Sequence, residues 1–325
     1  MAVWRDFVVD DGGRGTPVTV GLVGAGRWAR LTHGPMHSAP GPTRLTGVWA
    51  RRADAAEELA NELGVPVYQR FDELLEACEA VDFAVPPGVQ AEMAPVAARA
   101  GKALLLEKPL AKTLDQARAV ADAAGEHGVA TIVALTRRYH PRTRDFLAAA
   151  ARLREEGPLA GGQAAYLHGG YLPGGFLAGT AATTWRGEPT GMLLDIGPHL
   201  LDVVQEAAGP VEAVRAEGDA TRHLTLTTRH DGGWLVQSLL SGAVAVEHPV
   251  TRAEILSGQG HLRWDTEGMA GDEPWARLRG EFAAAVRDGA PVTADARHAV
   301  RLQAVLHAAW VSATEGGWVD VPATP

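Results

Sequence analysis

Apolar and polar positions alternate in blocks over the first part of the chain, from Pro17 to about Thr136. Short apolar segments there are separated by segments of helical periodicity, which is typical of strand-helix-strand units around a parallel sheet. The apolar segments predict buried strands at residues 19–23, 45–49, 81–85, 103–106 and 130–135. We therefore predict an α/β fold whose first domain is a doubly wound parallel sheet.

The helices between these strands have recognisable ends. A helix at 54–63 is closed by Gly64, and a second helix begins at Thr113 and is closed by Gly128. Thr113 and Gln116 have the spacing of a capping box. These signals support the alternation of strands and helices.

The pattern changes after Arg137. A predicted helix at 142–155 is followed by glycine- and proline-rich chain, and then by short strands with turns at 231–233 and 258–260. Helical patterns at 275–288 and 294–314 complete the chain. We predict a loose arm at 1–16, a Rossmann domain at 17–137 and an α+β substrate domain at 138–325. The second domain has an open, mainly antiparallel sheet, and its closing helices pack back toward the first domain.

A glycine loop follows the first predicted strand. Gly24, Gly26 and Ala29 form the GxGxxA version of the dinucleotide fingerprint. Gly24 permits a tight turn, Gly26 lets the backbone approach a pyrophosphate, and the following helix offers its N-terminal N–H groups to the phosphates. The alternative is a merely structural turn, but the position between a strand and a helix favours a dinucleotide site.

The end of the second strand bears on which dinucleotide binds. An acidic residue there would bond the ribose 2′-hydroxyl of NAD(H), whereas this chain has Arg51 and Arg52. Guanidinium groups suit a 2′-phosphate, and Arg27 of the glycine loop can assist. We predict NADP(H), with NAD(H) as the alternative; solvated arginines at a helix start would be the structural explanation.

A charged pair, Glu107 and Lys108, directly follows the leucines of the fourth predicted strand. Ligands of open α/β sheets bind beyond the carboxyl ends of the strands, so these residues are expected in the same site as the glycine loop. A lysine there can polarise a hydroxyl or carbonyl oxygen. The alternative is a surface ion pair.

Asp195, His199 and Asp202 lie at positions i, i+4 and i+7 of a predicted helix, and therefore on one face. His199 can exchange a proton near neutral pH, and Asp195 can orient it or bind a substrate hydroxyl. Metal binding and simple helix packing are the alternatives. We predict acid-base chemistry without a metal.

Several motifs resemble the glucose-fructose oxidoreductase, inositol dehydrogenase and rhizopine-catabolism family. They are VGLVGAGRWA, FAVPPGVQAEMA, EKPLAKT, GMLLDIGPH and the C-terminal EFAAAVRDGAPVTADARHAVRLQAVLHAAW. The glycine loop alone is unspecific, but the EKP element combined with the DxGxH element is specific. The resemblance covers nearly the whole chain from Val18 on.

The resemblance implies hydride transfer between a nicotinamide and a carbon bearing oxygen on a sugar, cyclitol or related polyol. It implies that Lys108 is the catalytic lysine, that His199 exchanges the proton and that Asp195 holds substrate and histidine. The expected cofactor-binding residues are Gly24, Gly26, Arg27, Trp28, Arg51, Arg52, Pro86, Pro87, Gln90, Glu107, Lys108, Trp185 and Arg186. Gln90 departs from the family, which often has histidine there. The resemblance also implies a homodimer or homotetramer formed through the C-terminal sheet.

Composition excludes several other classes. With 46% apolar and 21% charged residues the chain can bury a sizeable core, and its net charge of −9 argues against a broad surface for nucleic acid or anionic membrane. No apolar run approaches the roughly 18 residues of a membrane span. Cys78 is the only cysteine, which excludes an intramolecular disulfide and favours a reducing compartment. We predict a cytoplasmic protein with a small polyhydroxylated or keto substrate.

Two other functions remain as alternatives. A regulator could keep the fold and use the dinucleotide to control an interaction, although it has no chemical need for Lys108, Asp195 and His199 together. A redox-neutral enzyme could use transient oxidation to eliminate or hydrolyse a glycosidic bond. The Gly-, Ala- and Thr-rich loop at 169–183 is expected to shape the substrate pocket.

Overall fold

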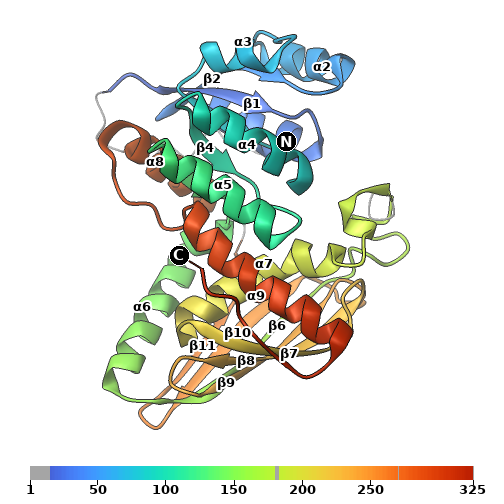
Figure 1. Cartoon of the computed structure of the whole chain (residues 1–325), viewed down its shortest axis with the longest axis vertical. Coiled ribbons are helices and arrows are strands. Elements are labelled where there is room, and N and C mark those ends of the chain that lie inside the picture. Colours follow the sequence, from blue (N-terminus) through green and yellow to red (C-terminus); the bar gives the residue numbers. More distant parts are fainter. Residues whose placement is uncertain (1–14, 180–182, 270, 325) are drawn as a thin grey trace. The chain divides into compact units, whose positions relative to one another are not determined.

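The computed structural model of the protein describes residues 15–179, 183–269 and 271–324 (Figure 1). Most of the predicted N-terminal arm, residues 1–14, lies outside these ranges. Contacts within the chain divide it into two units. The first runs to Tyr139 and includes Gly271–Val300, and the second holds the intervening residues and those from Arg301 on.

The first unit contains a parallel sheet in the order β2-β1-β3-β4-β5. Its strands are β1 (Val18–Val23), β2 (Thr43–Trp49), β3 (Ala80–Phe83), β4 (Ala103–Leu106) and β5 (Thr131–Val133). Its helices are α1 (Gly34–Ser38), α2 (Ala53–Leu63), α3 (Phe71–Glu76), α4 (Pro87–Arg99), α5 (Leu114–Glu126) and α8 (Glu273–Asp288), with a π-helical turn at Ala29–His33 and a 3₁₀ turn at Thr136–Tyr139. This confirms the predicted Rossmann fold.

Local signals in the sequence account for these elements. Every residue of β3 and β4 is buried, as expected for central strands of a parallel sheet that is covered on both faces. Gly64 ends α2 in the left-handed conformation, at φ 68°, and the Thr113 hydroxyl accepts a hydrogen bond from Gln116 N–H at the start of α5. These caps confirm the helix ends predicted from the sequence.

Helix α8 completes the core of the first unit. Its Leu278 and Phe282 are fully buried and belong to the same apolar cluster as Val18, Leu105 and Ile132 of the sheet. The sequence analysis places this segment in a second domain that begins at residue 138, as one of the closing helices that pack back toward the first domain. Contacts within the chain place the first division between Tyr139 and His140 and group α8 with the first unit, because its apolar side chains fill that core.

The second unit contains a seven-stranded sheet in the order β11-β10-β6-β9-β8-β7-β12. Neighbouring strands are antiparallel except for β6 and β9, which confirms a mainly antiparallel sheet. The strands are β6 (Leu159–Leu167), β7 (Val211–Asp219), β8 (His223–His230), β9 (Leu235–Ser241), β10 (Val250–Ser257), β11 (His261–Asp265) and β12 (Trp318–Asp320).

Helices cover this sheet on one side. They include α6 (Pro141–Glu156) and α7 (Gly191–Ala208), while α9 (Ala296–Glu315) begins in the first unit and continues in the second. The almost entirely buried α7 contacts β6, β8, β9 and β10. Buried and more exposed residues alternate along β8, so one face of that strand lies on a core. Within the described parts of the chain, no helix is long and apolar enough to span a bilayer.

Candidate functional site

The two glycines of the predicted fingerprint play different parts in the turn after β1. Gly24 has φ 119°, and a Cβ at this position would collide with the carbonyl oxygen of Ala84. A Cβ at Gly26, by contrast, would meet no atom within 4 Å. Gly24 is therefore required by the fold, whereas Gly26 leaves open space in which a phosphate could approach the backbone.

A cavity of about 220 Å³ opens beside this loop. It is lined by Gly24, Ala25, Gly26, Trp49, Ala50, Arg51, Arg52, Ala55, Ala84, Val85, Pro86 and Val89. The structure thus brings together the glycine loop and the carboxyl ends of β2 and β3, with several of the predicted cofactor residues. Arg27, Trp28, Pro87 and Gln90 do not line this cavity.

Arg51 and Arg52 lie at the start of α2, where the sequence predicted contact with a 2′-phosphate. Arg51 is exposed, and the Arg52 side chain is 77% exposed with its Nε 3.8 Å from Asp54 Oδ1. Both guanidinium groups are therefore accessible at the edge of the cavity. An exposed pair of this kind fits an anionic ligand group.

The loop after β4 is held by the buried side chain of Gln90. Gln90 Nε2 donates to the backbone oxygens of Glu107 and Leu110 at 2.8 and 2.9 Å, and its Oε1 accepts from Glu107 N–H at 2.8 Å. Both ends of the amide are thus used within the protein. The structure gives Gln90 a supporting part in the loop that carries Lys108, where the sequence had suggested contact with the cofactor.

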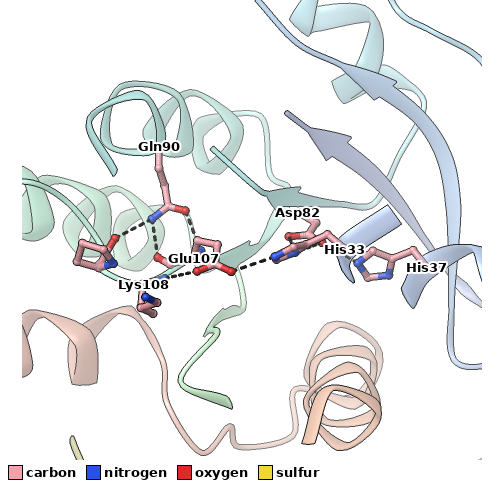
Figure 2. A network of polar contacts seen from close by, with 7 residues as sticks. His33, His37, Asp82, Gln90, Glu107 and Lys108 are labelled. Atoms are coloured by element: carbon pink, nitrogen blue, oxygen red, sulfur yellow. Dashed lines mark hydrogen bonds and ion pairs between the residues drawn. The ribbon is translucent and has the colours of Figure 1, made fainter. Parts of the chain in front are cut away.

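Glu107 bonds an imidazole that the sequence analysis did not single out. His33 Nε2 lies 3.0 Å from Glu107 Oε1, and His33 Nδ1 lies 2.9 and 2.8 Å from the two oxygens of Asp82 (Figure 2). His37 Nε2 lies 3.0 Å from Asp82 Oδ2. His33, His37 and Asp82 are all buried, so these residues form a polar network inside the first unit.

The network shifts the pKa values of its members. Burial by itself lowers the pKa of His33, but Asp82 and Glu107 outweigh it and raise the pKa to about 10. Burial by itself raises the pKa of Asp82, yet the charge and hydrogen bonds of His33 and the hydrogen bond of His37 lower it to about 2. Burial lowers the pKa of His37. His33 is therefore an imidazolium at neutral pH, whereas His37 is neutral.

One signal in the sequence could have revealed this network. Asp82 stands in the apolar segment VDFAV, and a carboxylate in a buried central strand requires partners. The positions of His33 and His37 in the chain gave no indication that they are those partners.

In the second unit, Asp195 of α7 is held by two side chains. Its Oδ1 lies 3.1 Å from Arg186 Nη2, and its Oδ2 accepts a hydrogen bond of 3.2 Å from the Tyr171 hydroxyl. Arg186 also lies over the ring of Trp185, 4.4 Å from its centroid. The structure thus joins the predicted Trp185–Arg186 pair to the predicted Asp195.

Tyr171 belongs to the loop at 169–183 that the sequence left unassigned, and residues 180–182 of this loop lie outside the described ranges. Burial, followed by the charge of Asp195, raises the pKa of Tyr171, so the hydroxyl stays protonated and donates.

His199 lies one turn after Asp195 on α7, with its ring centroid 6.3 Å from that of Tyr166. Among the described residues, no group of three or more His, Cys, Asp and Glu side chains could hold a metal ion.

Comparison with known proteins extends this description. Residues 18–135 match the family model of an oxidoreductase family with an NAD-binding Rossmann fold. The chain spans little more than half the length of several curated relatives, among them an uncharacterized protein of Saccharomyces cerevisiae (30% identical over 210 residues, 62% of this chain and 58% of the relative).

Two other relatives carry descriptive names. The chain is 28% identical to scyllo-inositol 2-dehydrogenase (NADP(+)) IolW of Bacillus subtilis over 245 residues, 70% of this chain and 63% of the relative. It is 27% identical to D-xylose 1-dehydrogenase (NADP(+)) 2 of Haloferax volcanii over 300 residues, 82% of this chain and 88% of the relative.

Solved structures share the fold. GenD2 from gentamicin A biosynthesis in complex with NAD has a TM-score of 0.81 at 24% identity and covers 96% of this chain and 99% of its own. Levoglucosan dehydrogenase in complex with NADH and L-sorbose has a TM-score of 0.79 at 21% identity and covers 94% and 99%. The match over residues 18–135 shows that this part of the chain is an NAD-binding Rossmann domain of the glucose-fructose oxidoreductase, inositol dehydrogenase and rhizopine-catabolism family, and the two named dehydrogenases are similar to the chain beyond this domain.

Proposed function

We propose that this protein is an NADP(H)-dependent oxidoreductase that acts on a carbonyl or hydroxyl carbon of a sugar, cyclitol or related polyol. The observation that carries the proposal is the arrangement at the carboxyl ends of one parallel sheet. There Gly26, with free space beside its Cα, lies in the turn after β1. The loop after β4, which Gln90 holds through hydrogen bonds to the backbone of Glu107, carries Lys108. Relatives named as dehydrogenases of inositol and xylose support the class of substrate.

The dinucleotide fits the residues present. The space at Gly26 suits its pyrophosphate, and the cavity lined by Arg51, Arg52 and Pro86 suits its adenosine half. When bound, the nicotinamide supplies or accepts a hydride. The exposed guanidinium groups of Arg51 and Arg52 support the choice of NADP(H), as do the names of two relatives, whereas NAD(H) occupies the related structures.

The chain's own residues handle the oxygen and the proton. In the direction of reduction, His199 donates a proton to the carbonyl oxygen while the ammonium of Lys108 stabilises the negative charge that develops there. In the reverse direction His199 is the base. The Asp195 carboxylate, fixed by Arg186 and Tyr171, orients a substrate hydroxyl.

The test is a turnover assay with NADPH and NADH against a panel of ketosugars and cyclitol ketones, and with the oxidised cofactors against the corresponding polyols. We expect His199→Ala to lower kcat by roughly 10² to 10⁴-fold, and Lys108→Met to lower it by a similar factor. Lys102→Met is the matched control, because Lys102 precedes the same strand at its other end and donates to Cys78 O. His248→Ala, at an 85% exposed side chain, controls for histidine loss.

The outcomes separate the alternatives. Full turnover in both active-site variants contradicts the assigned roles. Conversion of a glycoside without net change in reduced cofactor indicates the redox-neutral enzyme. Tight cofactor binding without conversion of any substrate indicates the regulator.

We further propose a cytoplasmic location and a homodimer or homotetramer that forms through the sheet of the second unit. A single cysteine, Cys78, supports the reducing compartment. Leu235, Leu239 and Leu256, apolar residues of strands β9 and β10, are at least 38% exposed and support burial by another subunit. Light scattering coupled to size exclusion tests this, and a monomer at micromolar concentration contradicts it.

A further inference from the structure

The imidazole of His33 is enclosed by acceptors on both sides. Its side chain is fully buried, with Asp82 bonded at Nδ1 and Glu107 at Nε2. Trp275 packs against a third side of the imidazole: the centroids of the His33 and Trp275 rings lie 5.1 Å apart, and their planes are at 71°. A neutral imidazole has only one N–H, so donation to carboxylates from both nitrogens requires the cationic form.

The neighbouring hydrogen bonds have a fixed direction. Arg279 Nε can only donate, and it does so to Thr43 Oγ1 at 2.7 Å. The Thr43 hydroxyl then gives its own hydrogen to His37 Nδ1, at 2.7 Å. His37 is left with its hydrogen on Nε2, which donates to Asp82. His37 is thus satisfied as a neutral ring, and the positive charge between Asp82 and Glu107 resides on His33.

This series of hydrogen bonds continues on the far side of His33 to the loop after β4 that carries Lys108. Glu107 Oε1 faces His33, and Glu107 Oε2 accepts from the backbone N–H of Lys108 at 3.0 Å. Gln90 holds the backbone of Glu107 on both sides. The orientation of the Glu107 carboxylate therefore fixes the peptide from which the Lys108 side chain leaves the strand.

His33 also belongs to the segment that follows the glycine loop. It is the last residue of the π-helical turn Ala29–His33, in which Gly34 N–H bonds Ala29 O. Such a widened turn rotates the following residues relative to a regular helix, and π-helical turns are frequent at functional sites. His33 thus links the segment after Gly26 to the loop of Lys108.

We propose that the His33 imidazolium is a positioning residue that holds Glu107 and, through it, sets the direction in which Lys108 leaves β4. This inference rests on the proposed function, in which Lys108 acts on the substrate oxygen. His33 touches neither substrate nor cofactor in this role. Its effect on turnover passes entirely through Lys108.

The experiment compares His33→Gln with His37→Gln, a buried histidine nearby that bonds Asp82 but not Glu107. Both variants lower the melting temperature. We expect only His33→Gln to lower kcat, by roughly 10- to 100-fold with little change in the cofactor KM, because a misplaced group weakens transition-state binding. A merely structural role leaves kcat per folded molecule unchanged in both.

A double-mutant cycle with Lys108→Met tests the route of the effect. In the Lys108→Met background, His33→Gln is expected to change kcat by less than about 3-fold, because the group that it positions is gone. An equal loss in both backgrounds overturns the proposal. Should His33→Gln fail to fold, Glu107→Gln replaces it in the same cycle, with the same expected pattern.

A second readout does not depend on activity. Lysines are reductively dimethylated with labelled formaldehyde, and the NMR signal of Lys108 is assigned from its loss in Lys108→Arg. The signal is expected to shift in His33→Gln and in Glu107→Gln but not in His37→Gln; an unchanged signal in the first two overturns the inference. If the wild type shows no turnover but the signal shifts, the proposed function fails and the positioning role stands.

Discussion

The side chain of Gln90 and the backbone of Glu107 bond each other twice, with the Gln90 amide donating to Glu107 O and accepting from Glu107 N–H, both at 2.8 Å. Gln90→Leu removes both bonds and leaves buried polar groups without partners. We expect the free energy of unfolding to fall by about 2 to 4 kcal/mol, measured by urea denaturation, and cofactor affinity to fall with it. Gln163→Leu is the control, because its bond to Glu254 is exposed; an equal loss there contradicts the supporting role of Gln90.

The two loop glycines should respond differently to alanine. Gly24→Ala forces a side chain against the Ala84 carbonyl at positive φ, so we expect a loss of about 1 to 3 kcal/mol in unfolding free energy. Gly26→Ala meets no protein atom, so the protein should keep its stability while its affinity for NADP(H) falls. Thermal melting and fluorescence titration of the cofactor measure the two effects. Undiminished affinity in Gly26→Ala would mean that no phosphate approaches there.

Replacing Arg51 and Arg52 together by alanine should weaken NADPH binding while NADH binding stays nearly constant. Loss of charge-assisted hydrogen bonds to a phosphate costs roughly 1.5 to 3 kcal/mol, so the NADPH:NADH affinity ratio is expected to fall by about 10- to 100-fold. Arg44→Ala removes one guanidinium group from an exposed position near the other end of β2 and should leave the ratio unchanged. An unaltered NADPH:NADH affinity ratio in the double variant contradicts the proposal that Arg51 and Arg52 bind the 2′-phosphate.

Asp195→Asn should lower kcat/KM far more than Tyr171→Phe. The first change removes the carboxylate charge beside Arg186, whereas the second removes only one of the hydrogen bonds that orient it. We expect a loss of roughly 100-fold or more for the first and roughly 5- to 10-fold for the second. Steady-state kinetics measures the two losses of kcat/KM, at equal folded fractions checked by circular dichroism. A larger loss in Tyr171→Phe than in Asp195→Asn would assign the substrate contact to Tyr171.

The buried ion pair of His33 and Asp82 makes stability depend on pH. The pKa of Asp82 is lowered from 3.8 to about 2, so its contribution is present above pH 3.8 and is lost as the pH falls toward 2. The pKa of His33 is raised from 6.5 to about 10, so its contribution is complete below pH 6.5 and is lost as the pH rises toward 10. The pair therefore stabilises the fold most between these limits.

Urea denaturation of wild type and His33→Gln measures this dependence. The difference in unfolding free energy should be about 3 to 5 kcal/mol at about pH 6 and clearly smaller at about pH 9. Glu107, which also faces His33, raises the pKa of His33 as Asp82 does. A difference that is constant between the two pH values contradicts an imidazolium at this position.

The strands and most helix ends of the first unit followed from local patterns, because buried parallel strands are apolar throughout and Gly64 and Thr113 mark helix ends. The partnership of β6 with β9 did not, because their parallel pairing joins segments that are far apart in the chain. Hydrophobic alternation gives the faces of a strand but not its neighbours.

The candidate site was predictable where it rests on short motifs. Gly24, Gly26 and Lys108 stand in such motifs, and the motif at 191–199 contains Asp195. Tyr171 and His33 were missed, because each acquires its partner only through tertiary structure and stands in a segment without a motif. Asp82 alone could have pointed to His33, as a charge within a buried strand.

The late position of α8 in the sequence has a consequence for folding during synthesis on the ribosome. The strands of the first unit emerge early, yet Leu278 and Phe282, which complete their apolar cluster, are translated only after strands β6 to β11 of the second sheet. Until then the nascent Rossmann sheet exposes a hydrophobic surface to which chaperones would have to bind. A nonsense mutation before Gly271 should therefore yield an aggregating fragment and no independent nucleotide-binding domain.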